Sequence, residues 1–410
     1  MTLWVLKNAN VLDADKGVLL PDRHVVVEDN LIREIATSDP GLPGAISLDL
    51  RGATLMPGLI DAHVHVTAYA ADFGTLARSS PAYVAAQAAR ILNKMLMRGF
   101  TTVRDVGGAD FGLARAVEEG LFPGPRLLFG GKALSQTGGH GDMRGPGIEA
   151  YDGSYTQPGL GVMVDGVAEV RRAARAEVRR GAHHIKFMGG GGAASPTDRL
   201  DSDQFSEEEI AAIVEEAAMA NLYAVVHAYS ARTIERALRL GVRSIEHGNY
   251  LDEKTADLLK EKGAYLVPTL VTYRMGSKLG ARLGVSPTTL EKLNALVAPG
   301  LKAVELAKRK NIPMAYGTDL VGLELHEFQL NEFSIRREVV SAQELLRSAT
   351  VIGAELIRME KLVGRVEEGY LADLIAIKGN PLDDITVLER PEDSLVLGMK
   401  EGQIFKNVLS

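Results

Sequence analysis

The sequence contains no cysteine among its 410 residues. Disulfide bonds and thiolate metal sites are therefore excluded, and any metal must be held by nitrogen and oxygen ligands. No apolar run reaches the about 20 residues that a membrane-spanning helix needs. Residues 1–17 lack the basic segment and long apolar segment of a secretory signal peptide. We therefore expect a cytoplasmic protein that does not enter a membrane.

Basic residues are too few and too dispersed to form a stripe for a nucleic acid. The 46 Lys and Arg are outnumbered by 53 Asp and Glu, giving a formal net charge of −7. The densest basic segment, residues 171–180, follows helical spacing and is interpreted as a solvated helix face. A nucleic-acid partner is therefore not expected. A small-molecule or dipeptide substrate is expected instead, and self-association into a homo-oligomer stays open.

The two ends of the chain resemble each other in pattern. Both carry short apolar or alternating runs broken by Asn, Asp, Gly and Pro, which is typical of β-strands. These runs cover residues 3–6, 24–28, 31–35, 45–48, 372–377, 394–397 and 403–405. We predict that residues 1–56 and 359–410 together form one small composite β domain.

The middle of the chain, residues 57–358, alternates between short apolar runs and helical stretches. The apolar runs cover residues 59–66, 101–106, 126–129, 184–188, 224–229, 244–247, 265–269 and 314–318. Spacing near 3.6 residues predicts helices over 81–98, 167–180, 206–220, 231–240 and 252–262. Eight strands separated by helices or loops predict an α/β fold, a (β/α)8 TIM barrel. The alternative is a doubly wound sheet, which the lack of GxGxxG after an early strand disfavours.

Histidine is scarce, with nine residues, and its placement carries most of the functional evidence. His63 and His65 stand two apart on a predicted strand, so both imidazoles point to the same face. His227 and His247 each lie near the C-terminal end of a predicted strand, and Asp319 directly follows another. Barrel enzymes build their active sites at this end of the strands. These side chains are therefore expected to converge.

Lys186 lies within the apolar run 185–188, where an unpaired ammonium group is costly. An ammonium cannot ligate a metal, whereas addition of CO2 would turn the amine into an anionic carbamate. Neutral imidazole and carboxylate suit borderline metals such as Zn²⁺, Mn²⁺ or Co²⁺. Two such ions about 3.5–4 Å apart can share a hydroxide and polarise a carbonyl. The pattern thus favours metal-assisted hydrolysis.

Several motifs together resemble the amidohydrolase superfamily. They most resemble its imidazolonepropionase-like branch, which includes metal-dependent dipeptidases that act on Xaa-Pro. The resemblance covers essentially the whole chain. Its motifs are GLIDAHVH at 58–65, a strand lysine, HAY at 227–229, EHG at 246–248, GTD at 317–319 and GRVEEGYLADL at 364–374.

This resemblance implies that six side chains hold two divalent metal ions, expected to be zinc: His63, His65, Lys186, His227, His247 and Asp319. The first two histidines would bind the more buried ion, and the other two would bind the second. Lys186, expected to be N6-carboxylated, would bridge both ions. Asp319 would bind beside the first ion and act as general base and then general acid.

Three further residues are predicted to serve the substrate. His140 lies in the glycine-rich loop 136–142 and could polarise the scissile carbonyl or meet a substrate carboxylate; a loop histidine without a role is the alternative. Tyr229 could donate a hydrogen bond to substrate. Arg232, which begins a helix, could pair with a carboxylate, although a solvated surface position is the alternative. Asp105 and Glu246 are predicted to be carboxylates that orient the metal ligands. His183, His184 and His326 are predicted to be structural residues.

The predicted function is hydrolysis of amide bonds in dipeptides or N-acyl amino acids, with L-Xaa-L-Pro dipeptides as the best candidates and a metal-bridging hydroxide as nucleophile. One alternative is a cyclic-amide hydrolase of the imidazolonepropionase type. A second is a non-catalytic scaffold descended from such enzymes. The scaffold would be expected to lose ligands, yet all six are present.

Overall fold

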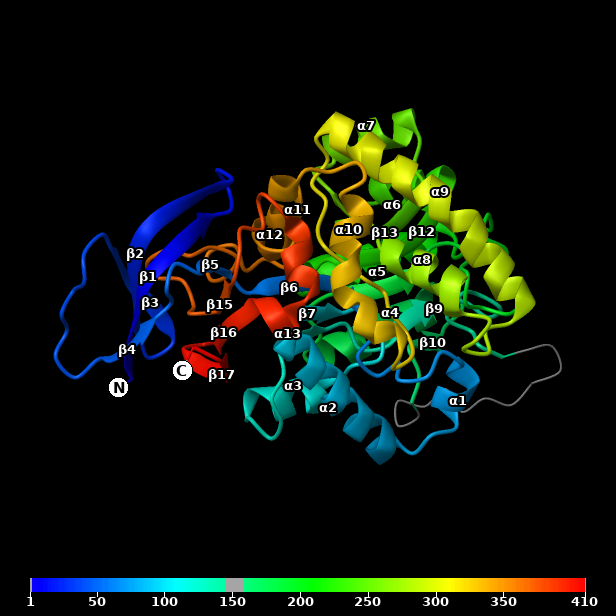
Figure 1. Cartoon of the computed structure of the whole chain (residues 1–410). Helices are drawn as coiled ribbons and strands as arrows, with labels where there is room; N and C mark the ends of the chain where they lie inside the picture. Colours follow the sequence, from blue (N-terminus) through cyan, green and yellow to red (C-terminus); the bar gives the residue numbers. More distant parts are fainter. Residues whose placement is uncertain (1, 145–157, 410) are drawn as a thin grey trace.

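Strands from both ends of the chain join one eight-stranded sheet in the computed structural model, which describes residues 2–144 and 158–409 (Figure 1). The strand order is β17-β16-β15-β5-β1-β2-β3, and β4 pairs with β1. The strands are β1 (Leu3–Asp13), β2 (Val18–Glu28), β3 (Leu31–Ala36), β4 (Ile46–Asp49), β5 (Thr54–Pro57), β15 (Leu374–Ile377), β16 (Leu395–Lys400) and β17 (Gln403–Asn407). The expected β-rich unit made from both termini is thereby confirmed, while its exact boundaries stay a prediction.

The centre of this sheet is buried on both faces. Every residue of β5 and β15 is buried, and the two strands pair antiparallel with each other. The sheet has its own apolar core, which includes Leu6, Val25, Leu55, Leu374 and Leu397. Because this core draws on both ends of the chain, the two termini stabilise each other.

The remaining strands build the barrel in parallel. One set is β6 (Leu59–Val64), β7 (Phe100–Asp105) and β8 (Arg126–Phe129); the other follows β11 (Ile185–Met188), β12 (Ala224–Ser230), β13 (Ser244–Tyr250) and β14 (Tyr265–Val267). The two sets meet where His183 N–H donates to the Phe129 carbonyl at 2.9 Å. Short strands β9 (Ala133–Ser135) and β10 (Gly161–Met163) extend the second set beside β11.

Residues 314–318 close the barrel between β14 and β6. Ala315 N–H donates to Leu266 O at 3.0 Å, and Ala62 N–H donates to Tyr316 O at 2.8 Å. The predicted strand at this place is reduced to a single bridge between Leu266 and Met314, because the chain soon turns out of the strand direction. The (β/α)8 architecture is confirmed.

The predicted helices are α2 (Pro81–Met97), α4 (Val167–Arg179), α5 (Glu207–Met219), α6 (Ala231–Arg239) and α7 (Glu253–Glu261), each within about a residue of its expected bounds. Ser206 begins α5 with a capping box that includes Glu209, which fixes that boundary locally. Among the described residues, no helix has the length and apolar character needed to cross a membrane.

Other elements were not predicted from the sequence. Two of them, α8 (Leu270–Leu279) and α9 (Pro287–Lys310), pack together beside the C-terminal ends of the barrel strands (Figure 1). The rest are α1 (Phe73–Ala77), α3 (Phe111–Glu118), α10 (Glu332–Arg336), α11 (Ala342–Ser348), α12 (Val351–Leu356), α13 (Pro391–Ser394), and the 3₁₀ helices η1 (Leu325–Asn331) and η2 (Ile385–Glu389).

Candidate metal centre and active site

Two histidines and an aspartate meet where β6 faces the closing segment of the barrel. The potential ligand atoms of His63, His65 and Asp319 all lie within 4.8 Å of one another. Asp319 Oδ1 is 3.4 Å from His63 Nε2 and 3.3 Å from His65 Nε2. Two imidazoles and one carboxylate at this spacing are a donor set that divalent zinc accepts. The residues fit a metal ion.

Hydrogen bonds behind the two imidazoles select the nitrogen that faces the cluster. His63 Nδ1 is 2.6 Å from Glu246 Oε2, and His65 Nδ1 is 2.8 Å from the Gly107 carbonyl. Both partners are acceptors, so each Nδ1 carries the proton. The lone pair on each Nε2 is therefore directed at Asp319. Metal-binding histidines are held by such outer contacts.

The second histidine pair lies directly beside the first. The ring centroids of His227 and His247 are 4.5 Å apart, and that of His247 is 5.0 Å from His63. His227 Nε2 is 3.2 Å from the Gly191 carbonyl, so this histidine presents Nδ1 to the cluster. His247 Nδ1 is 2.8 Å from the Thr269 hydroxyl, so Nε2 is the nitrogen of His247 left to face the cluster. All four imidazoles thus form one continuous cluster.

Lys186 lies on β11 and is 2% exposed. Burial lowers the pKa of its ammonium group to about 8, although Glu246 and Asp319 favour the charged form. The amine lines the same cavity as the four histidines and Asp319. The structure thus brings all six predicted ligands to one cavity.

A buried ion pair supports His63 from behind. Arg104 and Glu246 are both fully buried, with Arg104 Nη2 2.8 Å from Glu246 Oε1. Burial alone would raise the pKa of Glu246, but Arg104 and His63 outweigh burial and hold it well below its usual range. Asp105 accepts hydrogen bonds from the backbone of Val66, Gly107 and Ala109, next to His65. Glu246 therefore contacts the candidate ligand His63 directly, and Asp105 orders the backbone beside the candidate ligand His65.

Backbone strain is concentrated at two of the six residues. His247 has φ 74° and Asp319 has φ 52°, both in the left-handed region that side-chain-bearing residues rarely adopt. Such conformations persist where the surrounding structure enforces them, commonly at functional sites. Close packing adds a further constraint, because a Cβ at Gly317 would lie 2.9 Å from His63 Cβ.

The cluster lines a cavity of about 530 Å³. Tyr229 lines it, with its ring centroid 4.7 Å from that of His227. Burial raises the pKa of the Tyr229 phenol, so the hydroxyl stays protonated and able to donate. Much of the remaining lining is apolar and includes Met143, Leu160, Met188, Leu283, Val285 and Leu293. Apolar walls with a few polar groups are typical of small-molecule sites.

His140 is brought to the cluster, whereas Arg232 is not. The His140 ring stacks on His227 with centroids 4.3 Å apart, and His140 lines the cavity. The Arg232 side chain is 68% exposed and pairs with Asp203, and it also donates to the Asp201 carbonyl at 3.2 Å. The helix start turns Arg232 toward solvent, so its predicted contact with substrate is not supported.

The three histidines predicted to be structural are absent from the described lining of the cavity. His183 Nδ1 accepts the Phe129 N–H at 3.2 Å. Burial lowers the pKa of His184 and of His326, so both stay neutral. Sequence reasoning missed Arg104, although a charged residue inside an apolar strand is the same signal that singled out Lys186.

Parallel strands closed into a barrel, with imidazole, amine and carboxylate groups gathered at their C-terminal ends, define a barrel hydrolase. The chain belongs to the amidohydrolase family, whose model matches residues 54–405. It is therefore a hydrolytic enzyme that acts on amide bonds. The family predicted from the sequence motifs is confirmed.

Known relatives resemble the chain over nearly its full length. An ochratoxinase of Aspergillus niger is 33% identical over 97% of this chain and 86% of its own. A prolidase solved in complex with N-methylphosphonate-L-proline is 45% identical, with a TM-score of 0.96 over 99% of this chain and 100% of that chain. An Xaa-Pro dipeptidase with bound methionine is 30% identical, with a TM-score of 0.90 over 99% of this chain and 100% of that chain.

Proposed function

We propose that this amidohydrolase holds two divalent cations, with zinc expected, and cleaves L-Xaa-L-Pro dipeptides. Other dipeptides and N-acyl amino acids are further candidate substrates. The observation that carries the proposal is the cavity in which His140 and Tyr229 flank the histidine cluster. The 45% identity to a prolidase solved with a proline derivative supports the choice of substrate.

The ligand sets follow the two histidine pairs. His63, His65 and Asp319 would hold one ion, and His227 and His247 would hold the other. When bound, the ions would activate a water molecule and polarise the scissile carbonyl. The hydrogen bonds behind His63, His65 and His227 leave one ring nitrogen of each facing the cluster, where it would bind an ion.

Lys186 would join the two ion sites as an N6-carboxylated residue. The amine must be neutral to add CO2, and burial favours the neutral form by lowering the pKa to about 8. The nitrogen forms a bond to the carbon of CO2 and loses a proton. Burial disfavours the resulting carbamate anion as well, so its charge would be balanced by the two cations that it binds.

Asp319 would move the proton. Burial opposes its ionised form, whereas divalent cations bound beside it would favour that form. An ionised carboxylate can take a proton from the attacking water and pass it to the leaving nitrogen. The N–H of Asp319 donates to the His63 carbonyl at 2.8 Å, which keeps the carboxylate beside the candidate metal ligands.

The free carboxylate of a dipeptide would be recognised by hydrogen-bond donors beyond the scissile nitrogen. Tyr229 lines the cavity and can supply one of them. His140 lines it as well, and in its imidazolium form its Nε2 could donate to that carboxylate or to the scissile carbonyl. A proline leaving group forms a tertiary amide without an N–H, so the site needs no acceptor there. These features favour Xaa-Pro over dipeptides whose amide N–H would need a partner.

The test compares Xaa-Pro, the matching Xaa-Pro amide, other dipeptides and imidazolonepropionate on one preparation of metal-replete enzyme. Loss of the terminal carboxylate should lower kcat/KM by about tenfold to a thousandfold, or roughly 1.4–4 kcal/mol of transition-state stabilisation. Equal rates on acid and amide would reject carboxylate recognition. A preference for imidazolonepropionate would favour the cyclic-amide alternative.

A further inference from the structure

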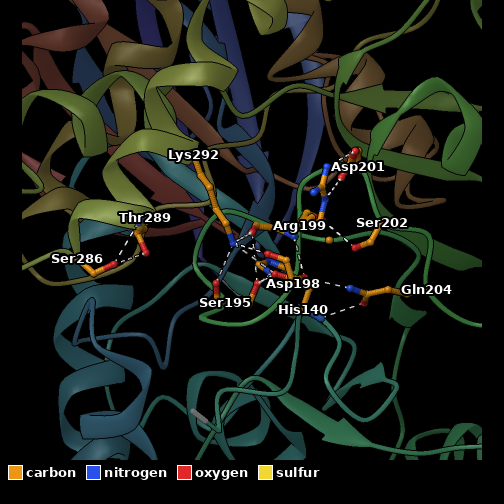
Figure 2. Close-up of polar contacts among 12 residues, drawn as sticks. His140, Ser195, Asp198, Arg199, Asp201, Ser202, Gln204, Ser286, Thr289 and Lys292 are labelled. Atoms are coloured by element: carbon orange, nitrogen blue, oxygen red, sulfur yellow. Dashed lines mark hydrogen bonds and ion pairs between the residues drawn. The ribbon is translucent and has the colours of Figure 1, made fainter. Parts of the chain in front are cut away.

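The loop that connects β11 to α5 reaches His140. Residues 189–204 follow β11, and Gly190 pairs with Asp203 at the base of this loop. His140 Nδ1 lies 2.8 Å from Ser195 Oγ, and the Ser195 hydroxyl also contacts Asp198 Oδ1 (Figure 2). An ionised carboxylate only accepts, so Ser195 donates to Asp198 and accepts from His140. The His140 proton is thereby fixed on Nδ1, and Nε2 is the nitrogen left for a substrate.

A second route leads from Asp198 to the backbone of His140. Gln204 Nε2 donates to Asp198 Oδ2 at 3.0 Å, and Gln204 Oε1 accepts the His140 backbone N–H at 3.0 Å. The side chain and the backbone of His140 therefore both connect to one carboxylate (Figure 2). Such a closed ring of hydrogen bonds fixes the position of the residue as well as the rotation of its ring.

Asp198 is itself held by a residue from another part of the barrel. Lys292 on α9 donates to the carbonyls of Gly192 at 3.1 Å, Ser195 at 3.0 Å and Asp198 at 2.7 Å. Its Nζ lies 3.6 Å from Asp198 Oδ1, and the Asp198 side chain is only 3% exposed. A buried carboxylate with this many partners cannot rearrange without leaving a donor unpaired.

The loop also limits the position of the imidazole by contact. A Cβ at Gly192 would lie 1.9–2.3 Å from three atoms of the His140 ring. On its other side, the His140 ring stacks against His227. The ring therefore lies between loop and candidate metal ligand, with its orientation set by Ser195.

We propose that Asp198 is a positioning residue for His140. Acting through Ser195 and Gln204, it fixes the imidazole so that Nε2 is presented to the substrate, while Lys292 secures the loop. This inference rests on the proposed function, because it requires that His140 contacts the reacting amide or its carboxylate. The competing interpretation gives Asp198 only a general role in loop stability.

The first experiment needs no substrate. In protein labelled with ¹⁵N-histidine and loaded with Zn²⁺, the His140 Nδ1–H should give a slowly exchanging proton resonance, assigned by its loss in His140→Asn. Ser195→Ala should abolish this resonance and Asp198→Asn should shift it. Asp201→Asn is the matched control, because Asp201 lies in the same loop, exposed and paired with Arg199. An unchanged resonance in both Ser195→Ala and Asp198→Asn would overturn the proposal.

The second experiment is a double-mutant cycle in kinetics. Asp198→Asn should lower kcat by about tenfold to a hundredfold with KM changed less than about threefold, since it disturbs a group acting in the chemical step. In a His140→Asn background the same change should cost less than about twofold, because coupled residues are not additive. An equal loss of kcat in the unmodified and the His140→Asn proteins would show that Asp198 only stabilises the loop, and it would overturn the proposal.

Gly192→Ala provides an independent variant that removes no polar group. Its methyl group displaces the His140 ring, so kcat should fall while Zn²⁺ content, measured by elemental analysis, stays unchanged. Should Asp198→Asn not fold, Ser195→Ala completes the same kinetic cycle. If the unmodified enzyme cleaves no dipeptide, the proposed function fails, but the resonance experiment still decides whether Asp198 positions His140.

Discussion

At the scale of single residues, the site depends on a carboxylate that faces two imidazoles. Asp319 has a left-handed backbone conformation, and its N–H donates to the His63 carbonyl at 2.8 Å. The backbone contact and the side-chain contact thus join the same two segments. This double attachment holds the carboxylate in the cavity lining, where it could transfer a proton to or from a bound substrate.

Asp319→Asn tests that role. The amide cannot accept and return a proton, so kcat should fall by roughly two to four orders of magnitude. Part of the bound metal should remain, because His63 and His65 are unchanged. Turnover and metal content are measured on the same samples. Near-normal turnover would remove Asp319 from the mechanism.

Lys186→Ala tests the bridge. Without the carbamate the variant should lose metal and activity together, and a short carboxylic acid such as acetate should restore part of both by entering the space left behind. The same acid should not raise the activity of Asp319→Asn, which serves as the control. Retention of two ions per chain by Lys186→Ala would contradict the bridging role.

The histidines among the candidate ligands stand out in the sequence because histidine is scarce and lies on or near predicted strand ends, whereas the full set of six follows from the motifs shared with the family. Two histidines separated by one residue, or a lysine inside an apolar run, can be recognised within one predicted strand without knowledge of the fold. The network around Asp198 gives no such signal. Its members lie at residues 140, 195, 198, 204 and 292, and only the folded barrel brings these distant segments together. Spacing alone does not decide between the two positions considered for Arg232, because its pairing with Asp203 on the exposed side appears only in the structure.

At the scale of elements, β13 departs from regular strand geometry at the site. Successive side chains on a strand face opposite sides, yet Glu246 contacts His63 and its neighbour His247 also faces the cluster. The left-handed conformation of His247 allows this. One short segment thus supplies both a candidate ligand and the carboxylate that orients another ligand.

Glu246→Gln should therefore weaken metal binding without removing a ligand. The amide can no longer pair with Arg104 as an anion, and it holds His63 less firmly, so affinity should fall by about tenfold to a hundredfold. Competition with a chromophoric chelator measures the dissociation constant. Glu118→Gln, at an exposed position at the end of α3, is the control. Equal affinity in both variants would contradict the orienting role of Glu246.

Elements were predictable where local signals agree. The capped helix α5 has an apolar stripe and a capping box, so its bounds follow from the sequence. In contrast, α9 contains Pro299, and a proline inside a helix normally ends it. Residues 314–318 were predicted as a strand, but they form one bridge because their role is to close the barrel and turn at Asp319.

At the scale of the whole molecule, the candidate ligands lie on segments far apart along the chain. They come from β6 and the residue that follows it, from β11, β12 and β13, and from the residue after the closing segment, so bound ions would connect several walls of the barrel. The unfolded chain does not hold these groups together. Metal binding should consequently favour the folded state over the unfolded one.

Metal removal should therefore lower the stability of the entire barrel. A ligand at about 100 times its dissociation constant stabilises the folded state by roughly 2.7 kcal/mol, so chelation should lower the Tm measurably by calorimetry. Readdition of Zn²⁺ with bicarbonate should restore both Tm and about two ions per chain. In His65→Ala, which lacks one candidate ligand, the chelator should change the Tm less. If chelation strips the ions and leaves the Tm of the unmodified protein unchanged, the ions do not connect the barrel walls, and the six side chains are already held in place by the protein alone.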